Sequence, residues 1–374
     1  MKIAFVYDRV YPWKKGGVEI RVWEFAQRLA DNHNVHMYGI HYWDGPPIIK
    51  REGVTLHGVC DPVDMYVKGR RSVKEALYFA GNVVGPLLSE EFDIIDCQEF
   101  PYFPVFAGEL HQLLGRSNLI VTWHEVWGDY WYEYLSRLGV VGKGVEWFLS
   151  RLSTPKIAVS NSVYDRLATN AGGSTYLVPN GIDVKNIQSI DKSDREWDVI
   201  YVGRLNEHKN VDVLLEAVAE LELEPSCGII GDGPEREYLS GLSESLGIED
   251  QVTFLGFVES HQDVIAEIKS SSVFVLPSNR EGFGMTVLEA AAAGTPIITT
   301  DHPMNAASDL VKDGENGFVV PISSAEIANA IRPILSESRL AQEFSTNAME
   351  FASKYDWDPL TSKLEDTYYA VSGQ

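Results

Sequence analysis

Short apolar runs, each bounded by polar or turn residues, recur along the whole 374-residue chain and alternate with segments of helical periodicity. Such runs are typical of strands that are buried on both faces of a parallel sheet. The alternation predicts an α/β protein with two doubly wound domains that face a cleft, and with ligands at the C-terminal ends of the strands. The expected strands are Lys2–Tyr7, Val35–His41, Val54–Val59, Asp93–Cys97, Leu119–Thr122, Ile157–Ser160, Thr175–Pro179, Asp198–Gly203, Cys227–Gly231, Val252–Leu255, Val273–Pro277 and Pro296–Thr300.

Helical segments are expected between these strands and at the end of the chain. The final stretch, Phe351–Tyr369, has a helical pattern and is typical of a terminal helix that packs on its own domain. Its periodicity alone does not reveal a crossing to the other domain. The remaining expected helices include Val18–Ala30, Gly144–Leu152, Val211–Leu221, Glu235–Leu246, Thr286–Ala293 and Ser324–Leu335.

Charge divides the chain near its midpoint. Residues 1–184 hold 18 Lys and Arg against 21 Asp and Glu, whereas the rest of the chain holds 13 against 33, so most of the net charge of −23 belongs to the second half. Together with the polar stretch Asp183–Glu196, this shift predicts two Rossmann-like domains, over residues 1–184 and 185–355. The negative balance excludes nucleic acid as an expected partner, because each phosphate contact needs a cationic side chain.

Cysteine use and hydropathy indicate a cytoplasmic protein. Cys60, Cys97 and Cys227 are an odd number and lie far apart, which fits neither a disulfide framework nor a zinc motif. We find no signal-peptide core and no apolar run close to the roughly eighteen residues of a membrane span. The basic run Lys68–Lys74 is either a solvated helix start or a peripheral contact with an anionic lipid at the inner face of a membrane.

The segment Pro277–Pro296 (PSNREGFGMTVLEAAAAGTP) is the richest in candidate chemistry. A glycine-rich turn that feeds a helix presents backbone N–H groups and the positive end of the helix dipole, which is a natural phosphate site. Glu281 in the turn and Glu289 in the helix are either ligands for sugar and ribose hydroxyls or two solvated carboxylates.

Two further loops follow strand ends in the same half. Tyr201–Asn210 (YVGRLNEHKN) carries Arg204 and Lys209, which are either ordinary surface charges or the cations that a diphosphate leaving group needs. The tight turn Gly231–Glu235 (GDGPE) is a candidate nucleotide contact, although turns of this kind are also common in other proteins.

Aromatic residues dominate the segment Trp123–Tyr134 (WHEVWGDYWYEY) in the first half. Flat rings beside carboxylates suit stacking on sugar rings, although a helix that buries its aromatics explains each single residue equally well. His124 is a base, a core histidine or a contact to the donor sugar. The candidate acceptor-binding residues are Trp127, Tyr130, Trp131, Tyr42 and Trp43.

Taken together, the motifs resemble the retaining GT-B glycosyltransferases of the family 4 type (glycosyl transferases group 1). The resemblance covers nearly the whole chain, and the joint order of the motifs makes it specific. It rests on Gly16-Gly17-Val18-Glu19, His124, Val178-Pro179-Asn180-Gly181-Ile182-Asp183, Gly203-Arg204, Lys209, Gly231-Asp232-Gly233-Pro234-Glu235, the pair Glu281 and Glu289, and Asn316-Gly317-Phe318.

The resemblance implies an acceptor-binding first domain, a nucleotide-sugar-binding second domain and a last helix, residues 356–374, that crosses back to the first domain. It implies transfer of a hexose from a UDP- or GDP-linked donor to a glycan or lipid-linked acceptor, with no metal or other cofactor required. Arg204 and Lys209 would hold the diphosphate, Glu289 the ribose and Glu281 the sugar. Further implied donor contacts are Gly17, Gly282, Phe283 and Gly284, with His124 near the far edge of the sugar.

One segment departs from the family pattern, and two other functions stay open. Residues 301–311 (DHPMNAASDLV) lack the usual glycine pair, which puts the contacts from that loop in doubt. A nucleotide-sugar epimerase of the same architecture would need no acceptor. A non-catalytic sugar-nucleotide or glycan-binding protein would not need the full set of charged residues.

Overall fold

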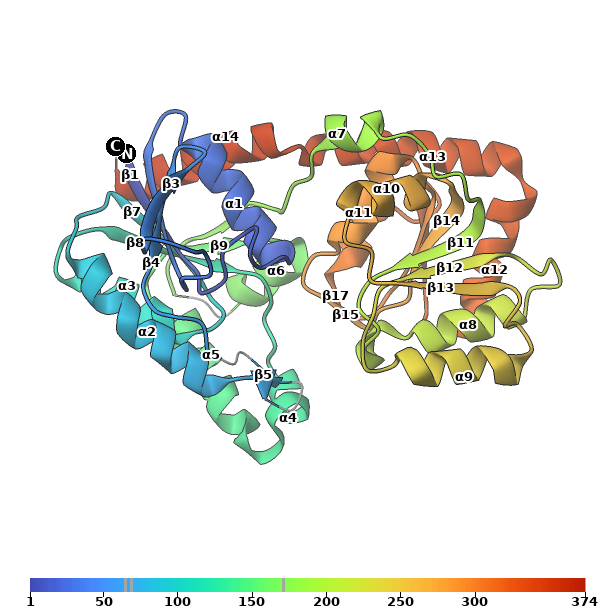
Figure 1. Cartoon of the computed structure of the whole chain (residues 1–374), viewed down its shortest axis with the longest axis horizontal. Helices are drawn as coiled ribbons and strands as arrows, with labels where there is room; N and C mark the ends of the chain where they lie inside the picture. Colours follow the sequence, from blue (N-terminus) through green and yellow to red (C-terminus); the bar gives the residue numbers. More distant parts are fainter. Residues whose placement is uncertain (64–65, 68–69, 170–171, 374) are drawn as a thin grey trace. The chain divides into compact units, whose positions relative to one another are not determined.

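The computed structural model describes residues 1–63, 66–67, 70–169 and 172–373. Contacts divide the chain into two compact units (Figure 1). The N-terminal unit comprises residues 1–180 and 357–374, and the C-terminal unit comprises residues 181–356. The division at residue 180 lies close to the polar stretch at which the charge changes.

The N-terminal unit is built on an eight-stranded sheet in which only the edge pair β3–β4 is antiparallel. The parallel strands carry the buried apolar runs of the sequence. The edge strand β3 was not predicted, because its residues alternate between exposed and half-buried and lack an apolar run. In sheet order the strands are β10 (Thr175–Leu177), β9 (Lys156–Ala158), β8 (Asn118–Trp123), β7 (Ile94–Gln98), β1 (Lys2–Val6), β2 (Asn34–Gly39), β4 (Val54–Gly58) and β3 (Ile48–Arg51).

Helices pack on this sheet through amphipathic faces. In α2, for example, Phe79, Val83 and Leu87 recur at a spacing of four and are fully buried. Ser72 caps α2 by accepting a hydrogen bond from the Glu75 N–H. The helices are α1 (Gly17–Leu29), α2 (Val73–Leu88), α3 (Phe103–Leu113), α4 (Tyr130–Leu135), η1 (Ser136–Leu138), α5 (Gly139–Ser150), α6 (Asn161–Ala168) and α14 (Trp357–Ser372), with a small ribbon of β5 (Tyr66–Val67) and β6 (Arg70–Arg71).

The C-terminal unit contains a six-stranded, wholly parallel sheet with its own hydrophobic core. Its strand order is β13 (Val252–Gly256), β12 (Cys227–Ile230), β11 (Trp197–Val202), β14 (Ser271–Leu276), β16 (Ile297–Thr300) and β18 (Gly317–Val320). The expectation of an α/β chain with parallel sheets is confirmed. The other elements are α7 (Val184–Ser189), η2 (Glu207–Lys209), α8 (Val211–Ala219), α9 (Arg236–Leu246), α10 (His261–Lys269), β15 (Arg280–Glu281), α11 (Met285–Ala293), β17 (Met304–Asn305), η3 (Ala306–Leu310), α12 (Ser324–Ser336), α13 (Ser338–Ala352) and η4 (Ser353–Tyr355).

The continuous helical pattern expected over Phe351–Tyr369 is wrong, because the chain breaks after η4 and starts again as α14. In an unbroken helix Pro359 would lack its N–H and would collide with the carbonyl of Tyr355, four residues earlier. That carbonyl instead accepts a hydrogen bond from the Ile182 N–H at 2.8 Å. Proline in the first turn of a new helix is tolerated, which explains where α14 begins.

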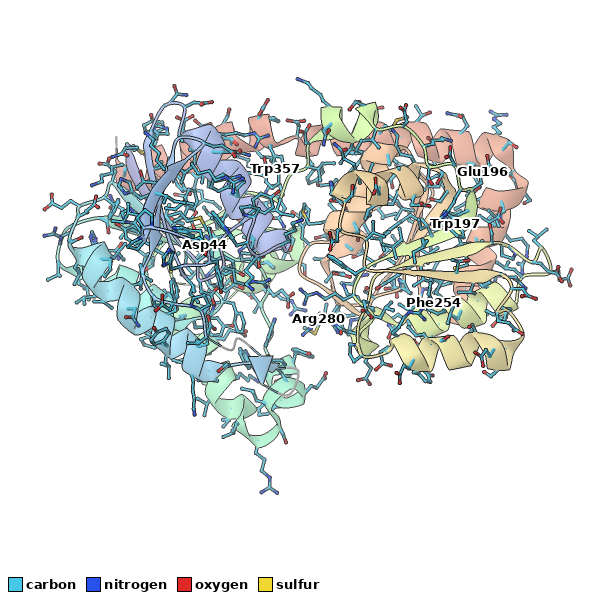
Figure 2. The ribbon with its side chains drawn as sticks, in the orientation of Figure 1. Asp44, Glu196, Trp197, Phe254, Arg280 and Trp357 are labelled. Atoms are coloured by element: carbon cyan, nitrogen blue, oxygen red, sulfur yellow. The ribbon has the colours of Figure 1, made fainter. Side chains whose placement is uncertain are left out.

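Helix α14 packs against α1 within the N-terminal unit. Trp357, labelled in Figure 2, lies edge-on to Phe25 with ring centroids 5.2 Å apart. Arg28 Nε lies 3.0 Å from Asp358 Oδ1. Among the described residues, no helix combines the length and the apolar character that a membrane span requires.

Candidate active site

Two loops that carry predicted site residues are tied together in the C-terminal unit. They follow β11 and β14, which are parallel neighbours and therefore end at the same edge of the sheet. The Asn279 N–H donates to the His208 carbonyl at 3.0 Å, and Asn210 Nδ2 donates to the Pro277 carbonyl at 3.0 Å. The predicted cationic loop and the predicted glycine-rich turn thus form one edge.

Lys209 and Glu281 meet at this edge. Lys209 Nζ lies 2.5 Å from Glu281 Oε1, and the same oxygen accepts a hydrogen bond from Ser278 Oγ at 2.7 Å. The two charged side chains are 15% and 13% exposed, so water screens their pairing only weakly. Arg204, on the same loop as Lys209, is exposed. Of the two cations that the sequence singled out, Lys209 is therefore engaged and Arg204 faces solvent.

His208 and Arg280 belong to the same cationic neighbourhood, although neither was singled out from the sequence. Burial, followed by the charges of Arg280 and Lys209, lowers the pKa of His208 to about 4. Arg280, labelled in Figure 2, directly precedes Glu281 on β15. The available signal was their position, since each is adjacent in sequence to a predicted site residue.

The turn at Gly231–Gly233 fits against the loop that carries Arg204 only because it lacks side chains. Gly231 has a φ of +135°, and a Cβ there would lie 1.8 Å from the Gly203 carbonyl oxygen. A Cβ on Gly233 would lie 2.3 Å from the Leu205 carbonyl oxygen. The glycines therefore allow two backbones to approach closely at the end of the sheet.

Helix α11 begins at the glycine-rich turn. Gly284 precedes it with a φ of +97° and supplies no side-chain cap, so the positive end of the helix dipole is not satisfied by a cap. Phe283 is only 6% exposed and packs against Tyr355, with ring centroids 6.2 Å apart. The Phe283 side chain is therefore a core residue, and any donor contact there would come from its backbone.

Glu289 has a partner that sequence reasoning missed. His261 Nε2, on α10, lies 2.9 Å from Glu289 Oε1. The carboxylate is 12% exposed and the imidazole 54% exposed. No local motif marks His261, because the contact joins residues 28 positions apart.

The segment that departs from the family pattern packs beside Glu281. Its short strand β17 pairs in parallel with β15, and Asn305 is in register with Glu281. Asn305 Nδ2 donates to the Thr300 carbonyl at 2.8 Å, and its Oδ1 accepts from the Ala307 N–H at 3.2 Å. Hydrogen bonds of one asparagine thus shape this segment in the absence of the glycine pair.

In the N-terminal unit, His124 follows β8 and heads a hydrogen-bond chain. Its Nε2 donates to Gln98 Oε1 at 2.8 Å, since Gln98 Nε2 donates to Asp96 Oδ1 at 3.0 Å. This network leaves Nδ1 of His124 with a lone pair. Burial, and then the charge of Arg21, lower the pKa of His124 well below its usual value, so the ring is neutral at neutral pH.

Asp96 anchors that chain to the last helix. It accepts hydrogen bonds from Thr122 Oγ1 at 2.7 Å and from Tyr368 Oη of α14 at 2.7 Å. Burial raises its pKa, against the hydrogen bonds and the charge of Arg21. Neither Asp96 nor Tyr368 was predicted, because 272 residues separate them in the sequence.

A cavity of about 130 Å³ lies beside His124. Glu99, which directly follows β7, is 3% exposed, and burial raises the pKa of its carboxyl to about 8. The cavity thus combines a protonated carboxyl, a neutral imidazole and aromatic walls, which suits hydroxyl-rich ligands. Its lining residues are Tyr7, Val18, Glu99, Phe100, Tyr102, His124, Glu125 and Trp127.

A buried carboxylate organises the aromatic segment around this cavity. Glu146 of α5 accepts hydrogen bonds from the Trp127 N–H at 2.8 Å, Tyr102 Oη at 3.0 Å and Trp131 Nε1 at 3.0 Å. These bonds fix the position of the aromatic segment against α5. Trp127 itself lines the cavity, with Tyr130 edge-on to it at 5.3 Å.

Two of the predicted acceptor-binding residues pack into the structure instead of presenting their rings. Trp131 is 4% exposed and belongs to the hydrophobic core. Trp43 is 6% exposed and donates its indole N–H to the Pro46 carbonyl at 2.9 Å. For both residues, the structure favours the interpretation that the ring packs into the core over a role in acceptor binding. Tyr42 is partly exposed, with Lys14 Nζ 4.9 Å from its ring centroid.

Gly17 is the first residue of α1, and Gly16 before it supplies no side-chain cap. A Cβ on Gly16 would lie 2.5 Å from Glu19 Oε2, and Glu19 pairs with Arg9 at 2.5 Å. Arg21, one turn later, donates to the Pro179 carbonyl at 2.7 Å. The glycine pair thus begins a helix that is hydrogen-bonded, through Arg21, to the chain at Pro179.

A cluster of metal-type ligands lies elsewhere in the N-terminal unit, although no metal site was predicted. His36, His57 and Glu90 place one ligand atom each within 4.8 Å of one another. His36 Nδ1 and His57 Nε2 are 2.8 Å apart, and Lys2 Nζ lies 2.6 Å from Glu90 Oε2. These contacts account for the cluster without an ion.

The basic run Lys68–Lys74 is only partly described. Lys68 and Gly69 lie outside the described residues, whereas Lys74 is exposed on α2.

Comparisons with known proteins fit this architecture. Residues 15–186 match the model of Glycosyltransferase Family 4, and residues 183–351 match that of Glycosyl transferases group 1. An uncharacterized glycosyltransferase of Methanocaldococcus jannaschii is 25% identical over 98% of both chains. The α-D-kanosaminyltransferase of Streptomyces kanamyceticus is 34% identical, over 46% of this chain and 45% of the relative.

Solved structures agree in fold. Sucrose-phosphate synthase from Thermosynechococcus elongatus superposes with a TM-score of 0.82 at 20% identity, covering 99% of this chain and 98% of the other. HepE of Anabaena, solved in complex with UDP and glucose, superposes with a TM-score of 0.76 at 21% identity, covering 98% of this chain and 99% of the other. With two matched models that together span residues 15–351, the chain belongs to the GT-B glycosyltransferases, with a family 4 N-terminal region and a group 1 C-terminal region.

Proposed function

We propose that this enzyme transfers a hexose from a UDP- or GDP-linked sugar to a hydroxyl of a glycan or lipid-linked acceptor, with retention at the anomeric carbon and without a metal. The observation that carries the donor assignment is the shared edge of Lys209, Glu281 and the uncapped start of α11. HepE, a structural relative, was solved with UDP-glucose. A cationic edge in an otherwise acidic half of the chain is what an anionic nucleotide requires.

We assign each part of the donor to a different group of residues in the C-terminal unit. Arg204, Lys209 and the first N–H groups of α11 take the diphosphate, as cations and helix N-termini do. Glu289 accepts hydrogen bonds from the ribose, and its bond to His261 keeps the carboxylate oriented. Glu281 lies by the hydroxyls of the transferred sugar, with backbone groups of residues 282–284 beside it.

The transition state develops positive charge on the sugar ring and negative charge on the departing diphosphate. Lys209 and Arg204 stabilise the leaving group electrostatically, so no divalent ion is needed for that purpose. The leaving phosphate takes the proton of the acceptor hydroxyl on the same face of the sugar, which gives retention. Glu281 is held by Lys209 and Ser278, and this supports a binding role over that of a covalent nucleophile.

We assign the acceptor hydroxyl to the cavity beside His124. Trp127 and Tyr130 offer ring surface, and the protonated Glu99 carboxyl donates a hydrogen bond to a sugar oxygen. His124 Nδ1 is left to accept a hydrogen bond from a hydroxyl of donor or acceptor.

The three cysteines are free and buried, which supports a reducing cytoplasmic location.

A panel of nucleotide sugars tests the proposal. The protein is incubated with UDP- and GDP-hexoses, with and without a mixture of glycan and lipid-linked acceptors, in the presence of EDTA. Release of the nucleotide diphosphate that depends on acceptor supports transfer, and NMR of the product should show the anomeric configuration of the donor. Epimerised donor without acceptor would indicate an epimerase, and binding without turnover would indicate a non-catalytic protein.

A further inference from the structure

Helix α5 presents its apolar side to solvent. Val140 and Val141 are 58% and 61% exposed, and Trp147 and Phe148 are 56% and 48% exposed. Spacings of seven and eight residues place the four on one face of the helix. The charged Glu146 lies on the opposite face, 5% exposed. The pattern is the inverse of that expected for a helix on the surface of a water-soluble domain.

The apolar face of α5 continues onto α3. The rings of Phe148 and Phe106 stack with centroids 6.3 Å apart, which joins the two helices. Along α3 and just after it, Leu110, Leu113 and Leu114 are 41%, 79% and 57% exposed. We name these outer faces of α3 and α5, together with Leu138 of η1, the apolar patch. Exposed apolar patches of this kind mark interaction surfaces.

Basic residues outnumber acidic ones around the apolar patch. Residues 103–116 and 136–151, all of them described, include Arg116, Arg137, Lys143 and Arg151 but only two acidic residues. Of these, Glu146 is buried and the partly buried Glu109 is engaged by Thr154. Arg151 holds its guanidinium 4.6 Å from the ring centroid of Trp147. Two of the cations pair with exposed carboxylates outside these segments, Lys143 with Asp129 at 2.5 Å and Arg116 with Glu91 at 3.7 Å. Four basic residues against two exposed acidic ones still leave a surplus of positive charge here, in a chain of net charge −23.

We propose that the apolar patch docks onto the interfacial region of an anionic lipid bilayer. Aromatic and aliphatic side chains enter the boundary of the acyl chains, while arginine and lysine at the edge meet the lipid phosphates. A second copy of the chain fits less well, because a two-fold contact through this patch would bring together two surfaces that carry the same surplus of positive charge. Docking goes beyond the proposed transfer reaction, and it would bring the N-terminal unit to a lipid-linked acceptor.

Vesicle flotation tests the docking without donor or acceptor. The full chain is mixed with vesicles of phosphatidylcholine alone, or with vesicles of phosphatidylcholine that contain about 30% phosphatidylglycerol. On the anionic vesicles, each basic residue near the surface contributes about 1 kcal/mol to the free energy of binding. We expect binding to the mixed vesicles, roughly tenfold weaker binding to phosphatidylcholine, and loss of most binding in about 1 M NaCl, where the Debye length is about 3 Å. Absence of binding to the mixed vesicles overturns the proposal.

A triple variant locates the surface. Val141→Ser, Trp147→Ser and Phe148→Ser together should weaken vesicle binding at least roughly tenfold, since interfacial affinity scales with buried apolar area. The matched control is Leu223→Ser, an equally exposed apolar residue of the C-terminal unit at 56%, which should bind as the wild type does. Unchanged binding by the triple variant contradicts the proposal. Light scattering adds a second test, because a wild-type dimer that the triple variant converts to monomers would assign the patch to a second copy.

Discussion

Replacing Lys209 by methionine removes the cation of the proposed donor edge but keeps an unbranched side chain. In the wild type, Glu281 Oε1 has two donors, Lys209 Nζ at 2.5 Å and Ser278 Oγ at 2.7 Å. The variant keeps only the hydroxyl, and at 13% exposure water replaces little of the loss. A lost hydrogen bond to a charged group should cost about 1.5–3 kcal/mol of the free energy of unfolding. Denaturant unfolding followed by fluorescence measures this cost.

The double variant Lys209→Met with Glu281→Gln separates folding from catalysis. A neutral amide no longer needs the ammonium, so stability should return to within about 1 kcal/mol of the wild type. The value of kcat/KM should stay low in both variants, by roughly 30- to 1000-fold, because about 2–4 kcal/mol of transition-state stabilisation is lost. Lys312→Met, which breaks an exposed ion pair at 3.5 Å, is the control and should change neither quantity measurably. Near-normal turnover in Lys209→Met refutes the assignment of Lys209 to the leaving group.

Three further substitutions test other parts of the structure. The folded chain keeps Glu99 protonated up to about pH 8, whereas the unfolded chain ionises it above about pH 4.5. The free energy of unfolding of the wild type should therefore fall as pH rises through this window, by up to about 1.4 kcal/mol per pH unit, and Glu99→Gln should lack that fall. If the unfolding free energies of the two proteins run parallel from about pH 5 to 8, the burial argument is contradicted. Gly231→Ala should destabilise the protein by about 2–4 kcal/mol in denaturant unfolding, because its Cβ meets a carbonyl oxygen at 1.8 Å, and a neutral effect would contradict the close approach. Tyr368→Phe should cost about 1–3 kcal/mol by removing a donor to Asp96, while the exposed Tyr369→Phe should stay within about 0.5 kcal/mol; equal effects would argue against the network.

The parallel strands were predictable because strands buried on both faces leave continuous apolar runs. Thr175–Pro179 and Val252–Leu255 were placed to within about two residues of β10 and β13. The antiparallel edge strand β3 was not, since a half-exposed strand lacks that run. The expected helix over Phe351–Tyr369 shows a different limit, because its helical pattern ran on through residue 356, where the backbone breaks before the helix that carries Pro359 in its first turn.

The candidate site was predictable where residues follow strand ends and not where they meet across the fold. Lys209 and Glu281 each stand in a loop after a strand, and neighbouring parallel strands bring such loops to one edge. The contacts of His261 with Glu289 and of Tyr368 with Asp96 depend on tertiary packing that no local pattern encodes. Burial was equally hidden, because an aromatic segment does not reveal that Trp131 faces inward.

Calorimetric titration of UDP and GDP into the wild type and into Lys209→Met, both in EDTA, tests the central claim most directly. Because Lys209 is proposed to hold the diphosphate, one of the two nucleotides should bind the wild type with one site per chain, and the variant should bind it at least roughly tenfold more weakly, a loss of about 1.4 kcal/mol. Binding of neither nucleotide, or equal affinity for both proteins, would contradict the proposed donor site.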